Sequence, residues 1–196
     1  MGGLGVQRPE PARTSDSDSA DPRPLILAFE RVRDLPYAID GGHDGDELLA
    51  MGRGDCLAKA DLLARDLTSL GQEVRLVRFG YLLPDVVPQA ARLPERSDLH
   101  RAVQVRRGDR WVLVDATHDP PLARGGLTVG KWDGINQTEP AYPPTGPVLV
   151  EGHDDTAIQE SLRQIAAWVS RTDPAVMGSW RQAYIRWLKE VQERAV

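Results

Sequence analysis

The sequence lacks the features that mark membrane and secreted proteins. Its 196 residues contain no run near the roughly 20 consecutive apolar residues that a membrane-spanning helix needs. A basic segment followed by an apolar run, as in a secretory signal, is also missing from the start of the sequence. We therefore expect a cytoplasmic protein with no membrane partner.

Clustered positive charge is missing as well. The sequence has 24 Lys and Arg residues against 29 Asp and Glu residues, which leaves a formal charge of −5. Nucleic acids and anionic membranes attract proteins chiefly through clusters of Lys and Arg. The composition therefore predicts no nucleic-acid partner.

Cysteine is nearly absent, because Cys56 is the single thiol of the chain. One cysteine can form neither an internal disulfide nor a multi-cysteine metal site. Any role of Cys56 must therefore be that of a lone thiol.

The chain divides into a tail and one domain. Residues 1–24 hold four prolines and few large apolar side chains, a composition typical of a disordered tail. Residues 25–196 are enough for one domain with a sizeable core but too few for two. We expect a single domain over 25–196.

Apolar spacing predicts four helices and three strands. The helices are expected at 25–35, 56–70, about 156–169 and from about 174, and the strands at 74–83, 99–106 and 111–116. A loop rich in Gly and Asp is expected over 40–46. The last two strands should form a hairpin around Arg107-Gly108-Asp109.

Cys56 is expected to be the first residue of a helix, with Asp55 as its N-cap. Unpaired N–H groups and the positive end of the helix dipole favour a thiolate at this position. The negative charge of Asp55 opposes that effect. A base or cation must therefore lie nearby if Cys56 is a nucleophile.

The histidines differ in what their positions predict. His43 and His153 lie in Gly/Asp-rich segments and are expected to be solvated turn residues. His100 begins a strand whose hairpin partner carries Asp115, and His118 follows that partner strand. A two- or four-residue hairpin loop puts His100 and Asp115 on one face of the sheet, whereas a three-residue loop separates them.

An Asp that accepts from one imidazole nitrogen leaves the other nitrogen free to take a proton from a thiol. Cys56, His100 and Asp115 could thus act as nucleophile, base and orienting acid. A lone cysteine is more often a small buried apolar residue, and a His and an Asp meet on neighbouring strands by chance. The spacing alone leaves both interpretations open.

Two segments carry a family resemblance. Residues 52–63, Gly-Arg-Gly-Asp-Cys-Leu-Ala-Lys-Ala-Asp-Leu-Leu, together with Leu67, Leu70-Gly71 and the segment 74–77, resemble the cysteine-bearing helix and next strand of the transglutaminase-like superfamily. His100 and then residues 108–117 resemble its His and Asp strands. The resemblance covers about 46–135.

The resemblance implies a fold and a set of roles. The fold would be α+β and papain-like, with the cysteine helix packed on an antiparallel sheet. The catalytic core would span about 46–135, with a helical extension at about 155–196. Cys56 would be the nucleophile, His100 the general base and acid, and Asp115 the orienting carboxylate. No cofactor is expected, and nothing resembles the calcium loops of animal transglutaminases. The clusters His43-Asp44-Asp46 and His153-Asp154-Asp155 have metal-ligand residue types but no defined third partner, so we assign no metal.

The chain departs from the family pattern after the histidine. Arg101 and Ala102 stand where family members often have Ala and an aromatic residue. The only oxyanion donor that the sequence suggests clearly is the backbone N–H of Cys56, with Tyr37 as a weaker candidate.

These observations predict an enzyme that acts on an amide, peptide or thioester through a Cys56 thioester. Water or an amine could resolve the thioester, so hydrolysis and transfer both stay open. A non-catalytic protein-binding module on the same fold is the alternative. Metal-dependent hydrolysis through His118 and Asp119 is a third hypothesis.

Three further features have structural interpretations. Trp132 is expected to close the core rather than line a cleft, and Lys59 to be exposed on its helix face. The two C-terminal helices carry apolar faces that need a partner. We expect them to pack on the core away from the Cys56 cleft or on a second copy of the chain.

Overall fold

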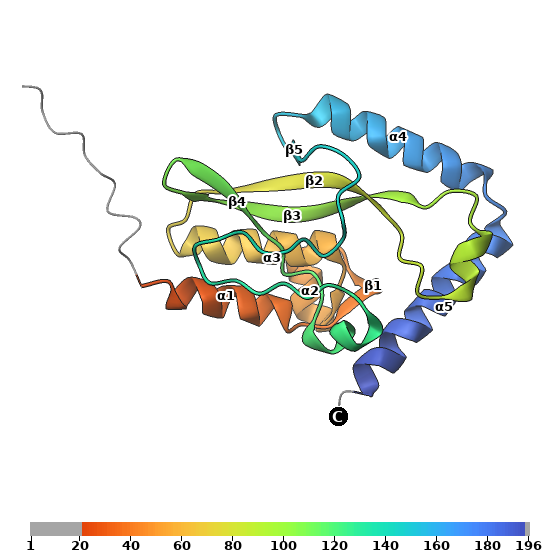
Figure 1. Ribbon diagram of the computed structural model, residues 1–196, viewed down its shortest axis with the longest axis horizontal. Helices are drawn as coiled ribbons and strands as arrows, with labels where there is room; N and C mark the ends of the chain where they lie inside the picture. The colour runs from red at the N-terminus through yellow and green to blue at the C-terminus, as the bar shows by residue number, and fades with distance from the viewer. Residues whose placement is uncertain (1–20, 195–196) are drawn as a thin grey trace, which may run out of the picture.

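The computed structural model describes residues 21–194 and has a mixed α+β fold (Figure 1). In chain order the helices are α1 (Arg23–Arg33), α2 (Gly45–Met51), α3 (Cys56–Ser69), α4 (Asp155–Arg171) and α5 (Pro174–Glu193), and the strands are β1 (Tyr37–Gly42), β2 (Val74–Leu82), β3 (Ser97–Arg107), β4 (Arg110–Val114) and β5 (Leu149–Val150). Two 3-10 turns, η2 (Pro88–Arg92) and η3 (Pro120–Gly125), lie in the connections. Strands β4, β3, β2 and β5, in that order, form a four-stranded antiparallel sheet.

The predicted tail lies largely outside the described residues. Its last positions correct the predicted boundary, because Arg23 and Pro24 belong to the first turn of α1. Pro24 fits there since the first helical N–H groups have no intrahelical partner to lose.

The β3–β4 hairpin has a two-residue loop. Arg107 pairs with Arg110, and Gly108 takes the positive φ of 58° that such tight turns need. Val103 pairs with Val114, so Asp115 comes level with Ala102 and lies diagonal to His100. This is one of the two registers that place His100 and Asp115 on the same face of the sheet.

Helix α3 begins and ends where its sequence predicts. The carboxylate of Asp55 accepts hydrogen bonds from the N–H groups of Leu57 and Ala58, at 2.9 and 3.1 Å. At the other end Gly71 has a φ of 77°, the left-handed conformation that often ends a helix. Cys56 is thereby fixed in the first turn.

The expected loop over 40–46 is only partly a loop. Strand β1 covers its first residues and α2 begins at Gly45, where Asp44 caps the N–H groups of Asp46 and Glu47. Within residues 21–194, strand β1 pairs only through isolated bridges to Gly54, and α2 is about two turns long. Elements this short and this little paired leave no readable apolar period in the sequence.

One core lies between the first helices and the sheet. Its centre joins Phe29 of α1 and Leu63 of α3 to Val103 and Val114 of the hairpin. Trp132 belongs to this core, as expected, and its indole N–H donates to the carbonyl of Asn136. Packing of this kind sets the position of α3 relative to β3 and therefore of Cys56 relative to the strand that carries His100.

A second core contains the C-terminal helices. Helix α5 contacts β1, η2 and η3, and α4 contacts β3 and β5 on the side of the sheet opposite α3 (Figure 1). The apolar faces of both helices also line the cavity into which Cys56 opens. The expectation that they pack away from the Cys56 cleft is therefore wrong, because the cleft itself is the surface that they cover.

Lys59 also contradicts its prediction. Its side chain is buried, and Nζ donates to the backbone carbonyls of Arg33 and Leu35, at 3.0 and 2.7 Å. The Arg33 carbonyl is at the end of α1 and the Leu35 carbonyl lies two residues beyond it, so both need donors from elsewhere, which a helical period cannot reveal. Within residues 21–194, no helix is long and apolar enough to cross a membrane.

Candidate active site

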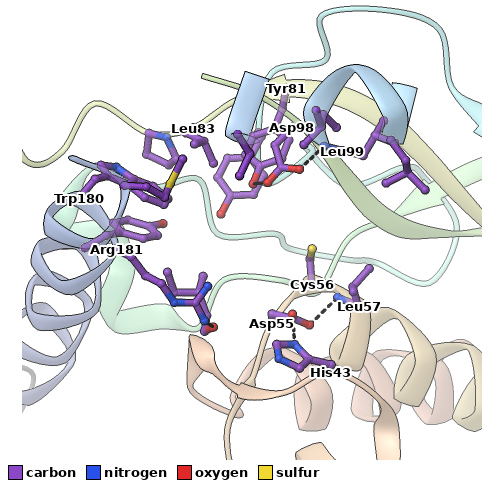
Figure 2. A pocket seen from close by; sticks show the side chains of 18 of the residues that line it. His43, Asp55, Cys56, Leu57, Tyr81, Leu83, Asp98, Leu99, Trp180 and Arg181 are labelled. Atoms are coloured by element: carbon purple, nitrogen blue, oxygen red, sulfur yellow. Dashed lines mark hydrogen bonds and ion pairs between the residues drawn. The ribbon is translucent and has the colours of Figure 1, made fainter. Parts of the chain in front are cut away.

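Cys56 opens into a cavity of about 320 Å³. Its walls come from the start of α3, the C-terminal end of β2, the N-terminal end of β3, and the facing sides of α4 and α5. Figure 2 shows Cys56 pointing from the start of α3 across this space, with Tyr81 and Asp98 on the opposite wall and Trp180 to one side. The cavity thus joins the sequence-predicted nucleophile to residues far away in the chain.

The backbone at Cys56 favours binding of an anion. The Asp55 carboxylate accepts hydrogen bonds from the N–H groups of Leu57 and Ala58. The N–H of Cys56 has no acceptor within the helix, because the helix begins at this residue. A partial negative charge beside the thiol would lie at the positive end of the α3 dipole. This N–H can serve as the expected oxyanion donor.

His100 and Asp115 form a buried pair. Nε2 of His100 lies 2.8 Å from Oδ2 of Asp115, and both side chains are almost fully excluded from solvent. Nδ1 of His100 is buried without a hydrogen-bond partner among the described residues. The ring is therefore held by one nitrogen, while the other stays available for a reacting group.

Asp115 is surrounded by donors. Oδ2 also accepts from the N–H of Ala141, at 2.8 Å, and Oδ1 accepts from the N–H of Thr117, at 3.1 Å. Burial alone would raise the pKa of Asp115, but the charge and hydrogen bond of His100 and these N–H donors hold it well below the ordinary value. Asp115 is thus an ionised acceptor fixed in orientation.

The pKa of His100 reflects both of its neighbours. Burial alone would lower it, but the charge and hydrogen bond of Asp115, followed by the effect of Cys56, raise it to about 10. The thiol is thus close enough to His100 to act on its protonation. At neutral pH the imidazole holds its proton beside Cys56, the arrangement in which a thiolate–imidazolium pair is stabilised.

Asp55 has a second partner besides the helix. Nδ1 of His43 lies 2.6 Å from Oδ2 of Asp55, and both residues line the cavity (Figure 2). His43 is largely exposed, as expected of a turn residue. Its contact with Asp55 can offset the negative charge that stands next to Cys56.

Four tyrosines surround the site, a feature that the sequence did not reveal. Tyr37, Tyr81, Tyr142 and Tyr184 all line the cavity, and burial raises the pKa of each. Tyr81 stacks on Tyr142, with ring centroids 4.2 Å apart, and both rings meet His100 at steep angles. The aromatic rings exclude water from the imidazole and restrict its rotation.

His118 does not enter the cavity. Its Nδ1 lies 2.8 Å from the carbonyl of Thr128, and its Nε2 lies 3.0 Å from the hydroxyl of Tyr142. A carbonyl can only accept, so Nδ1 carries the proton and Nε2 accepts from Tyr142. Burial lowers the pKa of His118 to about 4, which keeps the ring neutral.

Asp119 has a structural role. It accepts from the N–H of Tyr37, at 2.8 Å, and from the side chain of Gln192 of α5, at 3.0 Å. Among residues 21–194, no group of three or more His, Cys, Asp or Glu side chains is placed to hold a metal ion. His118 and Asp119 therefore lack the third ligand that a metal-dependent hydrolase would need there.

The chain matches no model of a known protein family, and no curated protein matches it significantly. The transglutaminase-like resemblance therefore stays a prediction. The functional argument depends on the site itself, which brings together a lone thiol, a buried imidazole and a carboxylate beside an aromatic cavity.

Proposed function

We propose that the protein is a cysteine-dependent acyl-transfer enzyme with a transglutaminase-like core. Cys56 is the nucleophile, His100 the general acid and base, and Asp115 the residue that orients His100. The observation that carries this proposal is the state of the His100 ring. One nitrogen is held by Asp115 and the other is free, in a residue whose pKa responds to Cys56.

The first half of the reaction forms the thioester. The Cys56 thiolate attacks the carbonyl carbon of an amide, peptide or thioester, and the negative charge moves to the carbonyl oxygen, which accepts from the Cys56 N–H. As the tetrahedral intermediate collapses, the bond to the leaving group breaks. The proton on Nδ1 of His100 goes to the departing amine or thiol, which leaves the acyl group on Sγ.

The second half reverses these proton movements. His100 now takes a proton from water or an amine, which attacks the thioester carbonyl. The C–S bond breaks, the thiolate returns, and the imidazolium re-forms beside it. Water gives hydrolysis and an amine gives transfer, because both acceptors use the same two groups.

The proposal can be tested by trapping the acyl-enzyme. The full chain is mixed with p-nitrophenyl acetate or an acetyl thioester, quenched in acid, and analysed by mass spectrometry for acetyl on Cys56. We expect rapid acetylation of the wild type, no adduct at position 56 in Cys56→Ser, and acetylation at least about a hundredfold slower in His100→Ala.

His153→Ala is the matched control, since His153 is exposed and lies in a turn near α4. It should acetylate at the wild-type rate. A His100→Ala variant that acetylates as fast as the control would contradict the proposal. Folded wild-type protein that never acetylates would favour the protein-binding module instead.

A further inference from the structure

The charged groups around the cavity differ in how well they are paired. Arg78 is held by Glu151 at 2.7 Å, and Arg181 donates to the carbonyl of Ile39 at 2.9 Å. Asp55 caps α3 and contacts His43. Three of the charges that line the cavity are therefore already engaged by protein groups.

Asp98 is the exception. Its Oδ1 accepts from the N–H of the next residue, Leu99, at 2.8 Å, and its Oδ2 has only the Tyr81 hydroxyl, at 3.4 Å. No Lys, Arg or His nitrogen of the described residues comes within ion-pair distance of it. Burial raises the pKa of Asp98 above the ordinary value, yet the group lies on the cavity wall (Figure 2).

The position of Asp98 relates it to the reacting atoms. It precedes His100 by two residues on β3, so the two side chains start from the same face of the strand, about 7 Å apart along it. Tyr81 contacts Asp98 and stacks on Tyr142, and both rings line the cavity together with Trp180. A carboxylate among aromatic rings attracts a cation through both its charge and the faces of the rings.

We propose that Asp98 binds a cationic amino group carried by the acyl donor. This inference rests on the proposed function, because it describes the substrate of the Cys56 site. Asp98 is then a specificity-determining residue, and the preferred acyl donor carries its ammonium or guanidinium group about one side-chain length from the scissile carbonyl.

Three thiol reagents that differ only in their terminal group provide the test. They are the 2-aminoethyl, 2-hydroxyethyl and 2-sulfonatoethyl methanethiosulfonates. In each reaction the Cys56 sulfur attacks the sulfenyl sulfur, an S–S bond forms, and methanesulfinate leaves with the electron pair. The rate of each reagent with Cys56 is divided by its rate with 2-mercaptoethanol, which corrects for intrinsic reactivity.

We expect the aminoethyl reagent to exceed the hydroxyethyl reagent about tenfold in this ratio, and the sulfonatoethyl reagent to be the slowest. Asp98→Asn removes the charge but keeps an acceptor for the Leu99 N–H, and it should reduce the preference to within about twofold. Asp109→Asn is the control, since it makes the same charge change at the exposed tip of the β3–β4 hairpin. It should keep the wild-type preference.

An equal preference in Asp98→Asn and Asp109→Asn would overturn the inference. Protection of the wild type gives a reading that needs no variant. At constant ionic strength n-butylammonium should slow the labelling of Cys56 by iodoacetamide, whereas n-butanol and butyrate should not. Equal protection by butanol would likewise count against Asp98.

These outcomes are separate from a failure of the proposed function. If Cys56 does not form an acyl-enzyme but its labelling still prefers the cationic reagent in an Asp98-dependent way, the cation site stands and the chemistry is wrong. If Cys56 is acylated without a cation preference, the proposed acyl-transfer function is supported and the cationic acyl donor is wrong.

Discussion

Nε2 of His100 lies 2.8 Å from Oδ2 of Asp115, and the same oxygen accepts the N–H of Ala141. One carboxylate oxygen thus connects the imidazole to the segment between β4 and β5, which contains Ala141. The geometry of the His100–Asp115 pair therefore depends on chain segments on both sides of β4.

Asp115→Asn should impair both activity and stability. An amide cannot stabilise the imidazolium, and its NH₂ group would face a backbone N–H now bound by the carboxylate. We expect acylation of Cys56 to fall by about 10²–10⁴ and stability by about 1–2 kcal/mol. Acetylation kinetics and thermal unfolding measure the two effects. A variant with wild-type kinetics would remove Asp115 from the mechanism.

Alkylation of Cys56 should be faster near neutral pH than that of a free cysteine. Against the effect of burial, the charge and hydrogen bond of Asp115 raise the pKa of His100 to about 10, so the imidazolium is present at pH 7 to stabilise a thiolate. We expect the iodoacetamide rate of Cys56 at pH 7 to exceed that of free cysteine, whose pKa is about 8.5, and to fall in His100→Gln. Equal rates in the wild type and in His100→Gln would argue against the pairing.

Lys59 should make stability rise with pH. Burial lowers its pKa from 10.5 to about 7, against the attraction of Asp119, so the unfolded chain binds the proton more strongly than the folded chain. Its contribution to stability therefore increases between about pH 7 and 10.5. Lys59→Met also leaves the carbonyls of Arg33 and Leu35 without their donor.

The two effects can be read from unfolding curves at pH 6.5 and 10. The free energy of unfolding of the wild type, compared with that of Lys59→Met, should increase from pH 6.5 to pH 10. At pH 10 the wild type should be the more stable of the two by roughly 2 kcal/mol. The exposed Lys131→Met provides the control and should show no such pH-dependent difference. If the stability advantage of the wild type over Lys59→Met became smaller as the pH rises, the lowered pKa of Lys59 would be contradicted.

His118 should make the protein sensitive to acid. Its pKa falls to about 4 in the folded state because burial disfavours the charged ring. Below the ordinary pKa of about 6.5 the unfolded chain takes up a proton that the folded chain refuses, so stability falls between pH 6.5 and 4. His118→Gln should lessen this decline, measured as the change in melting temperature, whereas His153→Gln should not. An unchanged decline in both variants would contradict the assignment.

Truncation after Asp154 should destroy both the core and the cavity. It removes Trp168, Trp180, Tyr184 and Leu188 from the second core and opens one wall of the site. We expect the truncated chain to aggregate or to unfold at a much lower temperature, as followed by light scattering and circular dichroism. A monomeric truncated chain with wild-type labelling of Cys56 would show that the helices are a separate module.

The sequence alone was sufficient for the hairpin and for helix α3. Arg107-Gly108-Asp109 between two apolar strands predicts the hairpin, but it leaves loops of two, three or four residues open, and only the structure shows the register that puts His100 and Asp115 on one face. Asp55 and Gly71 likewise mark the ends of α3. These are local features, determined by backbone conformations and hydrogen bonds within a few residues.

The surroundings of the site were decided only by tertiary structure. Lys59 was expected on an exposed helix face and is buried, whereas Tyr184 lies on the apolar face of its helix as its spacing predicts, and the partial burial of Asp98 had no signal in the sequence. Their environments depend on which elements pack over them. The hydrophobic period of a sequence identifies the apolar face of a helix but not the element that packs against that face. The apolar face of helix α5 packs on the side of the core where Cys56 lies, so α5 covers the cavity. This long-range packing partly encloses the single thiol.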